Sequence, residues 1–484
     1  MADTQSIHNI NQNIKQKTVK GVLWRIAEQG GNQLISFIVS VILARLIAPD
    51  QFGMIAMITV FLTLANVFID SGFSTALIRK NNRTPTDCST VYWFNILVSI
   101  ICYIILYFCA PLIAEFYNMP ELSSILRVLS LSIIIGSLSG VHRSLLQADM
   151  DFKALMKYNL IGLIISGIIG IILAYLDFKV WALVYQSLTG TILGTMFIFY
   201  KVKWRPSFAM SMDSFKEFFG FGWKMLASSI LNTIFNNLYT IVIGKIYKAS
   251  ELAFYNRSYS LSSLTSSTPT GILQSVTFPA LCKLQDNDDS LRNGYRRIIK
   301  ISAFVIFPLT LGLGAVAYPL INVLFTEVWI YSASLLTIIV FGAMWYPIHS
   351  INLNYLIVKG RSDLFFRLEI IKKIISVVIL VTSIPFGLEA ICWGSVIGSL
   401  LCLILNTYYT GKYLHMGIVA QIKDILHILI LSLAMFAGAR CVSIVMGNGI
   451  LSLTLAIITG IAIYVGGALL FSFPEVKELK NLRK

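Results

Sequence analysis

The sequence predicts an all-α polytopic membrane protein with about 14 transmembrane helices, built as two pseudo-symmetric six-helix lobes plus a C-terminal helix pair. Three observations predict it: an apolar composition, a succession of apolar runs, and an internal repeat. Of the 484 residues, 56% are hydrophobic and 13% are charged, whereas soluble domains carry about 25% charged residues. The formal net charge of +15 lies mostly in short loops, which indicates membrane topology rather than nucleic-acid binding.

A spanning helix needs about 20 mostly apolar residues. The runs that meet this need are 21–47, 52–78, 90–114, 122–148, 155–177, 180–200, 217–244, 252–281, 298–325, 331–358, 364–386, 388–411, 423–446 and 449–473. With the N-terminus inside, 31 of the 38 Lys and Arg residues fall on the inner side and six on the outer side. This bias follows the positive-inside rule and predicts that both termini are cytoplasmic.

The first and seventh spans resemble each other at an offset of 199–200 residues. Trp24-Arg25 matches Trp223-Lys224, and Asn32 matches Asn232. The offset equals six spans, which is an even number, so the two halves share one orientation, as in transporters with parallel repeats. The repeat predicts an N-lobe over 1–205 (spans 1–6), a C-lobe over 206–411 (spans 7–12), and spans 13–14 with a cytoplasmic tail over 412–484.

Polar residues recur at three- and four-residue steps in three of these spans, so each set shares one helix face. Charges inside a membrane normally face a bundle interior or a watery cavity. Cross-helix hydrogen bonding and snorkelling of basic residues are the competing explanations. A cation-rich polar cavity suits an anionic, hydrogen-bonding cargo such as phosphate plus sugar. The candidate substrate-binding residues are Arg25, Lys224, Arg257, Asn32, Asn232, Asn236 and Ser260.

Two carboxylates lie within the apolar runs, Glu28 in span 1 and Asp70 in span 2. Intramembrane carboxylates commonly carry proton or Na⁺ steps, so we name both as candidate ion-coupling residues. A structural role is an equal alternative, because Glu28 lies three residues after Arg25 and can pair with it.

Several motifs are missing from the sequence. No GxxxxGK[ST] motif is present, which argues against an ATP-driven motor, and no HExxH or CxxC motif occurs. The N-terminal 20 residues lack the apolar core of a cleavable signal peptide, and no polar stretch is long enough for a catalytic domain. The sequence therefore predicts a transporter rather than an enzyme, with no cofactor and no metal site.

The stretch GVLWRIAEQGGNQLISFIVSVILARLIAPDQFGMIAM, followed by FIDSGFSTALIRK, resembles the N-terminal signature of polysaccharide exporters of the Wzx type. These belong to the MOP (multidrug/oligosaccharidyl-lipid/polysaccharide) flippase superfamily, and the chain is most similar to the colanic-acid and teichuronic-acid exporter subgroup. The resemblance extends over the whole chain: span count, two lobes and the extra helix pair.

The resemblance implies a flippase of the bacterial inner membrane that moves undecaprenyl-diphosphate-linked oligosaccharide by alternating access, for capsule, exopolysaccharide or O-antigen synthesis. Arg25, Lys224 and Arg257 would then hold the pyrophosphate. The implied partners are the lipid-linked oligosaccharide, membrane lipids, a polysaccharide polymerase and a chain-length regulator, with no nucleic acid.

Two rival functions remain open. A MATE-like ion-coupled antiporter of drugs or small metabolites belongs to the same superfamily, although such proteins favour acidic cavities. A non-transporting scaffold or scramblase in envelope assembly is the other.

Overall fold

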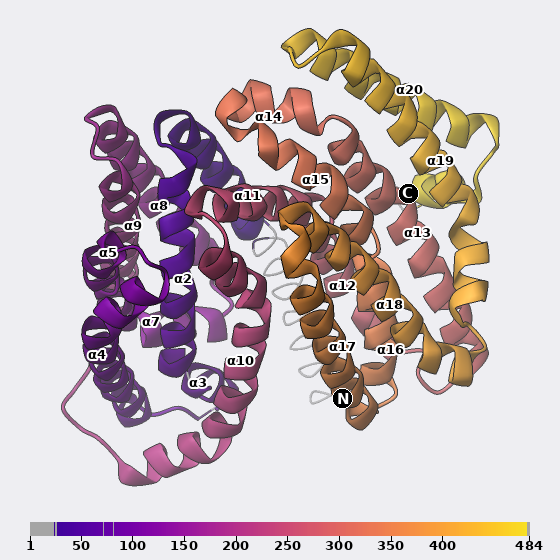
Figure 1. The fold of residues 1–484 in the computed structure, drawn as a ribbon. Coiled ribbons are helices and arrows are strands. Elements are labelled where there is room, and N and C mark those ends of the chain that lie inside the picture. The colour runs from indigo at the N-terminus through magenta and orange to yellow at the C-terminus, as the bar shows by residue number, and fades with distance from the viewer. Residues whose placement is uncertain (1–23, 25–26, 71, 81, 482–484) are drawn as a thin grey trace. The chain divides into compact units, whose positions relative to one another are not determined.

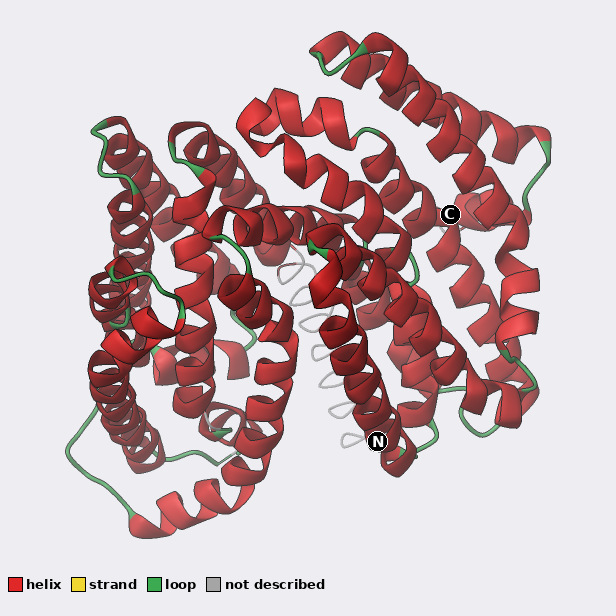
Figure 2. Cartoon of the chain, viewed as in Figure 1, coloured by secondary structure: helices red, strands yellow, loops and turns green. Residues whose placement is uncertain are grey.

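The computed structural model describes residues 24, 27–70, 72–80 and 82–481, and within them every regular element is a helix (Figure 2). The chain forms two compact units, Met1–Ala253 and Phe254–Lys484. In the first unit a helix over residues 27–46 precedes α2 (Pro49–Asp70), α3 (Phe73–Arg79), α4 (Pro85–Phe116), α5 (Glu121–Leu129), α6 (Leu131–Ser137), α7 (Gly140–Ala148), α8 (Phe152–Tyr175), α9 (Val180–Lys201) and α10 (Met212–Ile246), and Figure 1 labels all of these from α2 on except α6.

Helix α11 (Ala249–Thr265) runs from the first unit into the second. The second unit continues with α12 (Ser267–Cys282), α13 (Asp288–Ala315), α14 (Ala317–Phe325), a 3₁₀ turn (Glu327–Trp329), α15 (Ile330–Ala343), α16 (Tyr346–Val358), α17 (Ser362–Ser383), a 3₁₀ turn (Ile384–Phe386), α18 (Leu388–Leu414), α19 (Ile418–Met446), α20 (Ile450–Leu470) and α21 (Pro474–Asn481).

The all-α polytopic prediction is confirmed. Ten helices among the described residues are long and apolar enough to cross a membrane, and an eleventh span results if the bent pair Glu121–Ser137 and Gly140–Ala148 counts as one. Three other predicted spans lie on the helix 27–46, on α11 with α12, and on α17. Helix α17 carries four charged residues within 364–373, and α11 and α12 are rich in Ser and Thr. The count of 14 therefore stays a prediction.

Small residues allow close helix packing within the first unit. A Cβ placed on Gly162 of α8 would lie 3.3 Å from the backbone nitrogen of Gly194 on α9, so the two backbones nearly touch. Such small-residue contacts are a common way to associate helices in lipid, where no hydrophobic force drives association. The helix 27–46 packs on the same pair, with Val39, Leu43 and Ile47 in one apolar cluster with residues of α8 and α9.

The break after the first helix recurs in the second half of the sequence. Two residues separate the helix 27–46 from α2, which begins at Pro49, and two residues separate the end of α10 at Ile246 from the start of α11 at Ala249. The two breaks are 200 residues apart, which matches the offset of the sequence repeat. Next to them, a Cβ on Gly53 would lie 1.9 Å from the carbonyl oxygen of Ala249, so only glycine fits there.

Helix α10 packs against α2, α3 and α4 in the first compact unit. The lobes 1–205 and 206–411 follow from the sequence repeat, and the pair 412–484 lies outside that repeat. All three divisions stay a prediction. The structural division falls inside α11, after the helix that opens the second repeat.

Candidate functional site

One of the two predicted ion-coupling carboxylates, Glu28, is buried in the first unit, with 6% of its surface exposed. Asn159 of α8 donates a hydrogen bond from Nδ2 to Glu28 Oε1 at 3.3 Å. The Asn159 Oδ1 atom accepts from Arg143 Nη1 of α7 at 3.2 Å, and Arg143 Nε donates to Ser139 Oγ at 3.3 Å. This chain of polar groups joins the helix 27–46 to α8 and α7.

The other carboxylate, Asp70, is the last residue of α2 and is exposed. Arg143 interacts electrostatically with both Asp70 and Glu28. The structure thus brings the two predicted carboxylates together around one guanidinium, with two formal negative charges against one positive charge. Buried charges are tolerated when they are paired and hydrogen-bonded, and this arrangement meets that condition for Glu28.

Sequence reasoning placed Arg143 among the inner-side charges and overlooked Asn159. The available signal was an isolated Asn inside the apolar run 155–177, since polar residues in such runs usually bond to another helix.

The polar stripe of span 7 is exposed along α10. Ser228, Asn232 and Asn236 recur at four-residue steps and are all exposed. Asn237, next in sequence, is half-buried and donates its side-chain amide to the Thr233 carbonyl at 2.8 Å. A lipid-facing helix would turn amides such as Asn232 and Asn236 away from its surface, so this face is suited to water or a polar cargo.

The first helix has a similar exposed stripe. Gln29, Gln33 and Ser36 are exposed, while Asn32, the predicted binding residue, is half-buried. Arg25 lies outside the described residues. Lys224 lies in α10, but its side chain is also outside them. The side chains of two of the three basic residues in the pyrophosphate hypothesis, Arg25 and Lys224, therefore lie outside the described part of the structure.

The predicted residues of span 8 lie on α11, in the second unit. The Arg257 guanidinium lies over the rings of Phe325 and Trp329, with its carbon 4.7 and 4.9 Å from their centroids. Ser258 is buried and donates to the Ser332 carbonyl at 2.7 Å, which fixes one face of α11 to α15. Ser260 is exposed on another face.

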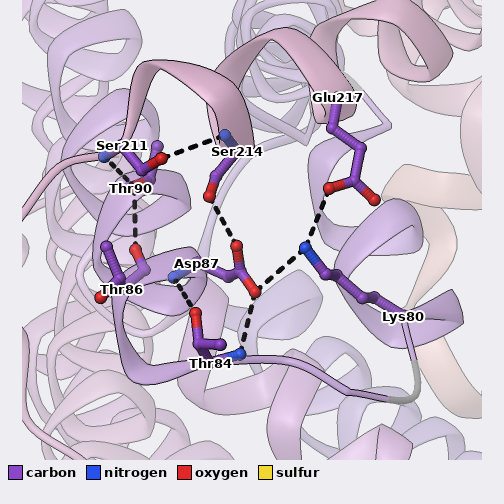
Figure 3. Close-up of polar contacts among 8 residues, drawn as sticks. All are labelled: Lys80, Thr84, Thr86, Asp87, Thr90, Ser211, Ser214 and Glu217. Atoms are coloured by element: carbon purple, nitrogen blue, oxygen red, sulfur yellow. Dashed lines mark hydrogen bonds and ion pairs between the residues drawn. The ribbon is translucent and has the colours of Figure 1, made fainter.

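A polar clamp, which sequence reasoning missed, holds the start of α10 against α4 (Figure 3). We define this clamp as Lys80, Asp87, Ser214 and Glu217. Asp87 accepts from Ser214 Oγ at 2.7 Å and lies 3.2 Å from Lys80 Nζ. Lys80 also donates to Glu217 at 2.9 Å. The hydrogen bond to Glu217, with a further contribution from Asp87, raises the pKa of the Lys80 ammonium above its ordinary value.

Local sequence explains why both helices begin at the clamp. Thr84 caps α4 by accepting from the Asp87 amide at 3.1 Å, and Asp87 accepts from the Thr84 amide at 2.9 Å. This reciprocal pair is a capping box with Asp at the third position, and Pro85 occupies the first helical position. Ser211 caps α10 by accepting from the Ser214 amide at 3.3 Å. The sequence stretches TPTD (84–87) and SMDS (211–214) predict the two helix caps. They do not predict that the two caps contact each other through Ser214 and Asp87.

No three His, Cys, Asp or Glu side chains gather as metal ligands within the described parts of the chain. The polar groups found above are amides, hydroxyls, carboxylates, guanidinium groups and the Lys80 ammonium. Such groups bind ligands by hydrogen bonds and charge.

Solved structures identify the fold. The chain is similar to the lipid II flippase MurJ in an inward closed conformation, with a TM-score of 0.73, 16% identity, and coverage of 93% of this chain and 99% of that chain. It is also similar to a multidrug-resistance MATE transporter of the MOP superfamily in an inward-facing conformation, with a TM-score of 0.62, 16% identity, and coverage of 82% and 94%. The fold is that of the MOP membrane transporters.

Sequence comparison identifies the family. The chain belongs to the polysaccharide biosynthesis protein family, whose pattern it matches over residues 42–334. It is 26% identical over 374 residues to the teichuronic acid biosynthesis protein TuaB of Bacillus subtilis (strain 168), covering 77% of each chain. It is 25% identical over 402 residues to the lipopolysaccharide biosynthesis protein WzxC of Escherichia coli (strain K12), covering 81% of this chain and 80% of that one.

These findings confirm the Wzx-type resemblance seen in the first two spans. The chain is a multi-pass membrane transporter and not an enzyme.

Proposed function

We propose that this protein is a flippase that carries undecaprenyl-diphosphate-linked oligosaccharide across the bacterial inner membrane by alternating access. The cargo would serve capsule, exopolysaccharide or O-antigen synthesis. The names of its relatives support a glycan pathway: besides TuaB and WzxC, the chain is 22% identical over 389 residues to a succinoglycan biosynthesis transport protein, ExoT of Rhizobium meliloti (strain 1021).

The observation that carries the proposal is the exposed amide stripe on α10. Asn232 and Asn236 offer donors and acceptors, as sugar hydroxyls require. Such side chains on a membrane helix are costly unless they meet water, a polar ligand or another polar group of the protein. We infer that this stripe, with Asn32 of the first helix and Ser260 of α11, lines the path of the oligosaccharide while the polyprenyl tail stays in lipid.

We assign the pyrophosphate to basic residues of the same predicted spans, 1, 7 and 8. Arg25, Lys224 and Arg257 supply the charge-assisted hydrogen bonds that phosphate oxygens prefer. Glu28 and Asp70 are the ion-coupling carboxylates in this scheme, with Arg143 as their shared partner. Both termini lie in the cytoplasm, and a polysaccharide polymerase and a chain-length regulator act on the product.

The proposal is tested by complementing a strain that lacks this gene. We expect the deletion to accumulate lipid-linked oligosaccharide, measured by extraction and mass spectrometry, and the wild-type gene to remove the accumulation. The double variant Asn232→Ala/Asn236→Ala should restore flux at least about tenfold less well, because two lost hydrogen bonds of about 1 kcal/mol each exceed the 1.4 kcal/mol that a tenfold change requires.

Asn237→Ala is the matched control, since that side chain bonds to its own helix. It should complement as the wild type does, at equal protein amount in the membrane. If the deletion strain accumulates no lipid-linked oligosaccharide but becomes sensitive to cationic drugs, the antiporter hypothesis replaces the flippase hypothesis. Equal complementation by the double variant and Asn237→Ala would remove the stripe from the transport path.

A further inference from the structure

The second unit contains a strongly basic pocket of about 420 Å³ at the start of α13 and α19. We call it the basic pocket, and its lining residues are Arg292, Arg296, Lys300, His415, Met416, Ala420, Lys423, Asp424 and His427. Nothing in the proposed transport path uses these residues. Four are permanent cations and one is a carboxylate, which leaves a formal excess of three positive charges with both histidines neutral.

The single carboxylate of the basic pocket is already paired. Both oxygens of Asp424 accept hydrogen bonds from the Arg296 guanidinium, and Lys300 lies 3.9 Å from Oδ1. Asp424 is buried, with 7% of its surface exposed. This pair fixes α13 to α19. Arg292 and Lys423, which are both exposed, add charge that Asp424 does not balance.

The start of α19 adds a second feature suited to anions. Its N-cap is Gly417, which provides no side-chain acceptor for the first-turn amides. The first amides of a helix lack partners within the helix and carry the positive end of its dipole. Because Ala420, in this first turn, lines the pocket, the backbone adds to the field of the side chains. Phosphate groups bind at such helix starts.

The position of Lys423 indicates the type of phosphate compound. On α19 the exposed face continues from Lys423 through Leu426, Ile430 and Leu433, which are 44%, 58% and 39% exposed. These positions recur at three- and four-residue steps, so they form one apolar stripe that leads directly from the pocket. A ligand that satisfies both the cations and this stripe has a phosphate head and a hydrocarbon tail.

We propose that the basic pocket binds the phosphate of an anionic phospholipid, with an acyl chain along Leu426, Ile430 and Leu433. Basic pockets between transmembrane helices on the cytoplasmic side of a membrane bind anionic lipid heads. The bound lipid bridges α13 and α19, so it acts as a structural ligand of the second unit and not as the transported cargo.

The test uses the full-length protein in nanodiscs made of equal parts phosphatidylglycerol and phosphatidylcholine. After transfer to detergent, native mass spectrometry counts the retained lipids. We expect the wild type to retain phosphatidylglycerol in preference to phosphatidylcholine. Arg292→Ala/Lys423→Ala should lower that preference about thirtyfold, since each basic residue near the surface contributes about 1 kcal/mol. This variant keeps the Arg296–Asp424 pair, so the unit should fold.

The matched control is Arg297→Ala/Lys412→Ala, which removes two exposed cations of the same unit that do not line the pocket. It should retain phosphatidylglycerol as the wild type does. Equal loss in both double variants would mean that only overall charge matters, and would overturn the proposal. So would displacement of the retained lipid by millimolar inorganic phosphate, because the pocket would then be a site for soluble phosphate. Since no transport is measured, failure here leaves the flippase proposal untouched.

Discussion

Arg143 interacts electrostatically with two carboxylates that come from different helices of the first unit. Glu28 is buried, and its hydrogen bond from Asn159 leads to Arg143. Removing Arg143 would leave the Asn159 side-chain oxygen without its donor and the buried Glu28 carboxylate without a balancing cation, and both losses are costly in a buried network. The residue therefore has a structural role in addition to any part in ion coupling.

We expect Arg143→Ala to destabilise the protein by about 1–3 kcal/mol, the range for leaving a buried polar group without its hydrogen-bond partner. The measurement is thermal unfolding of the purified protein in detergent. Adding Glu28→Gln should recover part of the loss, because the amide carries no charge that needs balancing. Lys153→Ala, at the start of α8, is the control and should unfold close to the wild-type temperature. If the double variant is as unstable as Arg143→Ala alone, Glu28 is not the partner that matters.

The sequence alone indicated Glu28 and Asp70 as candidate ion-coupling residues, because carboxylates are rare in apolar runs. It did not predict their common partner. Asn159 and Glu28 are 131 residues apart, and such a pairing depends on how α8 packs against the first helix. Arg143 lies near the end of the predicted span 122–148, where the charge count assigned it to the inner surface.

The polar clamp fixes one end of α10, the element that bears the amide stripe. Its contacts differ in strength because their exposure differs. The Asp87 side chain is 3% exposed, whereas the Glu217 side chain is 58% exposed. Exposed ion pairs contribute about 0–1 kcal/mol to stability. The contacts of Asp87 should therefore stabilise the polar clamp more than the contact between Lys80 and Glu217 does, although the latter is shorter. The share that comes from the Lys80 charge is full below the ordinary lysine pKa and is lost as pH rises past the raised pKa.

We expect Asp87→Asn to loosen the first turns of α10 more than Glu217→Ala does. The measurement is amide hydrogen exchange over residues 212–222. Asp87→Asn removes the charge paired with Lys80 and weakens the α4 cap, a loss of about 1–2 kcal/mol, which corresponds to exchange faster by about five- to thirtyfold if these turns exchange by local opening. Exchange in α20 serves as the internal reference and should not change. If Glu217→Ala has the larger effect on exchange, the exposed ion pair between Lys80 and Glu217 provides most of the stability of the polar clamp.

The long apolar helices were predicted closely, because hydropathy alone defines them. The predicted spans 180–200 and 388–411 correspond to Val180–Lys201 and Leu388–Leu414. Helices with polar beginnings were predicted too short. Helix α13 was expected from residue 298 but starts at Asp288, since its charged first turns are stabilised by the Asn287 cap and by contacts such as Arg296 with Asp424. Hydropathy does not detect caps or distant ion pairs.

At the scale of the whole molecule, the repeat and the charge distribution organise the chain. A two-residue helix break precedes both Pro49 and Ala249. The repeat found in the sequence therefore also appears in the structure. The charge distribution predicts that the connection 283–287 is cytoplasmic and that 447–449 is external.

Cysteine labelling in intact cells tests this topology. In a variant that lacks the seven native cysteines, we expect Gly449→Cys to react with a membrane-impermeant maleimide from outside. Among the described residues, no atom from another part of the chain lies within 4 Å of a Cβ built at this position. Asp286→Cys should react only after the membrane is permeabilised. Labelling of Asp286→Cys in intact cells would contradict the assignment of both termini to the cytoplasm.

The near-contact of Gly53 with Ala249 has a consequence for how relatives of this protein diverge. A side chain larger than hydrogen at position 53 has no room unless the backbone at 249 withdraws. Across an alignment, the two positions should therefore covary in size: a relative that replaces the glycine should carry a compensating shift or deletion in the short break that precedes its counterpart of α11. The matching breaks of the two halves are then expected to evolve together, even where the rest of each half drifts apart.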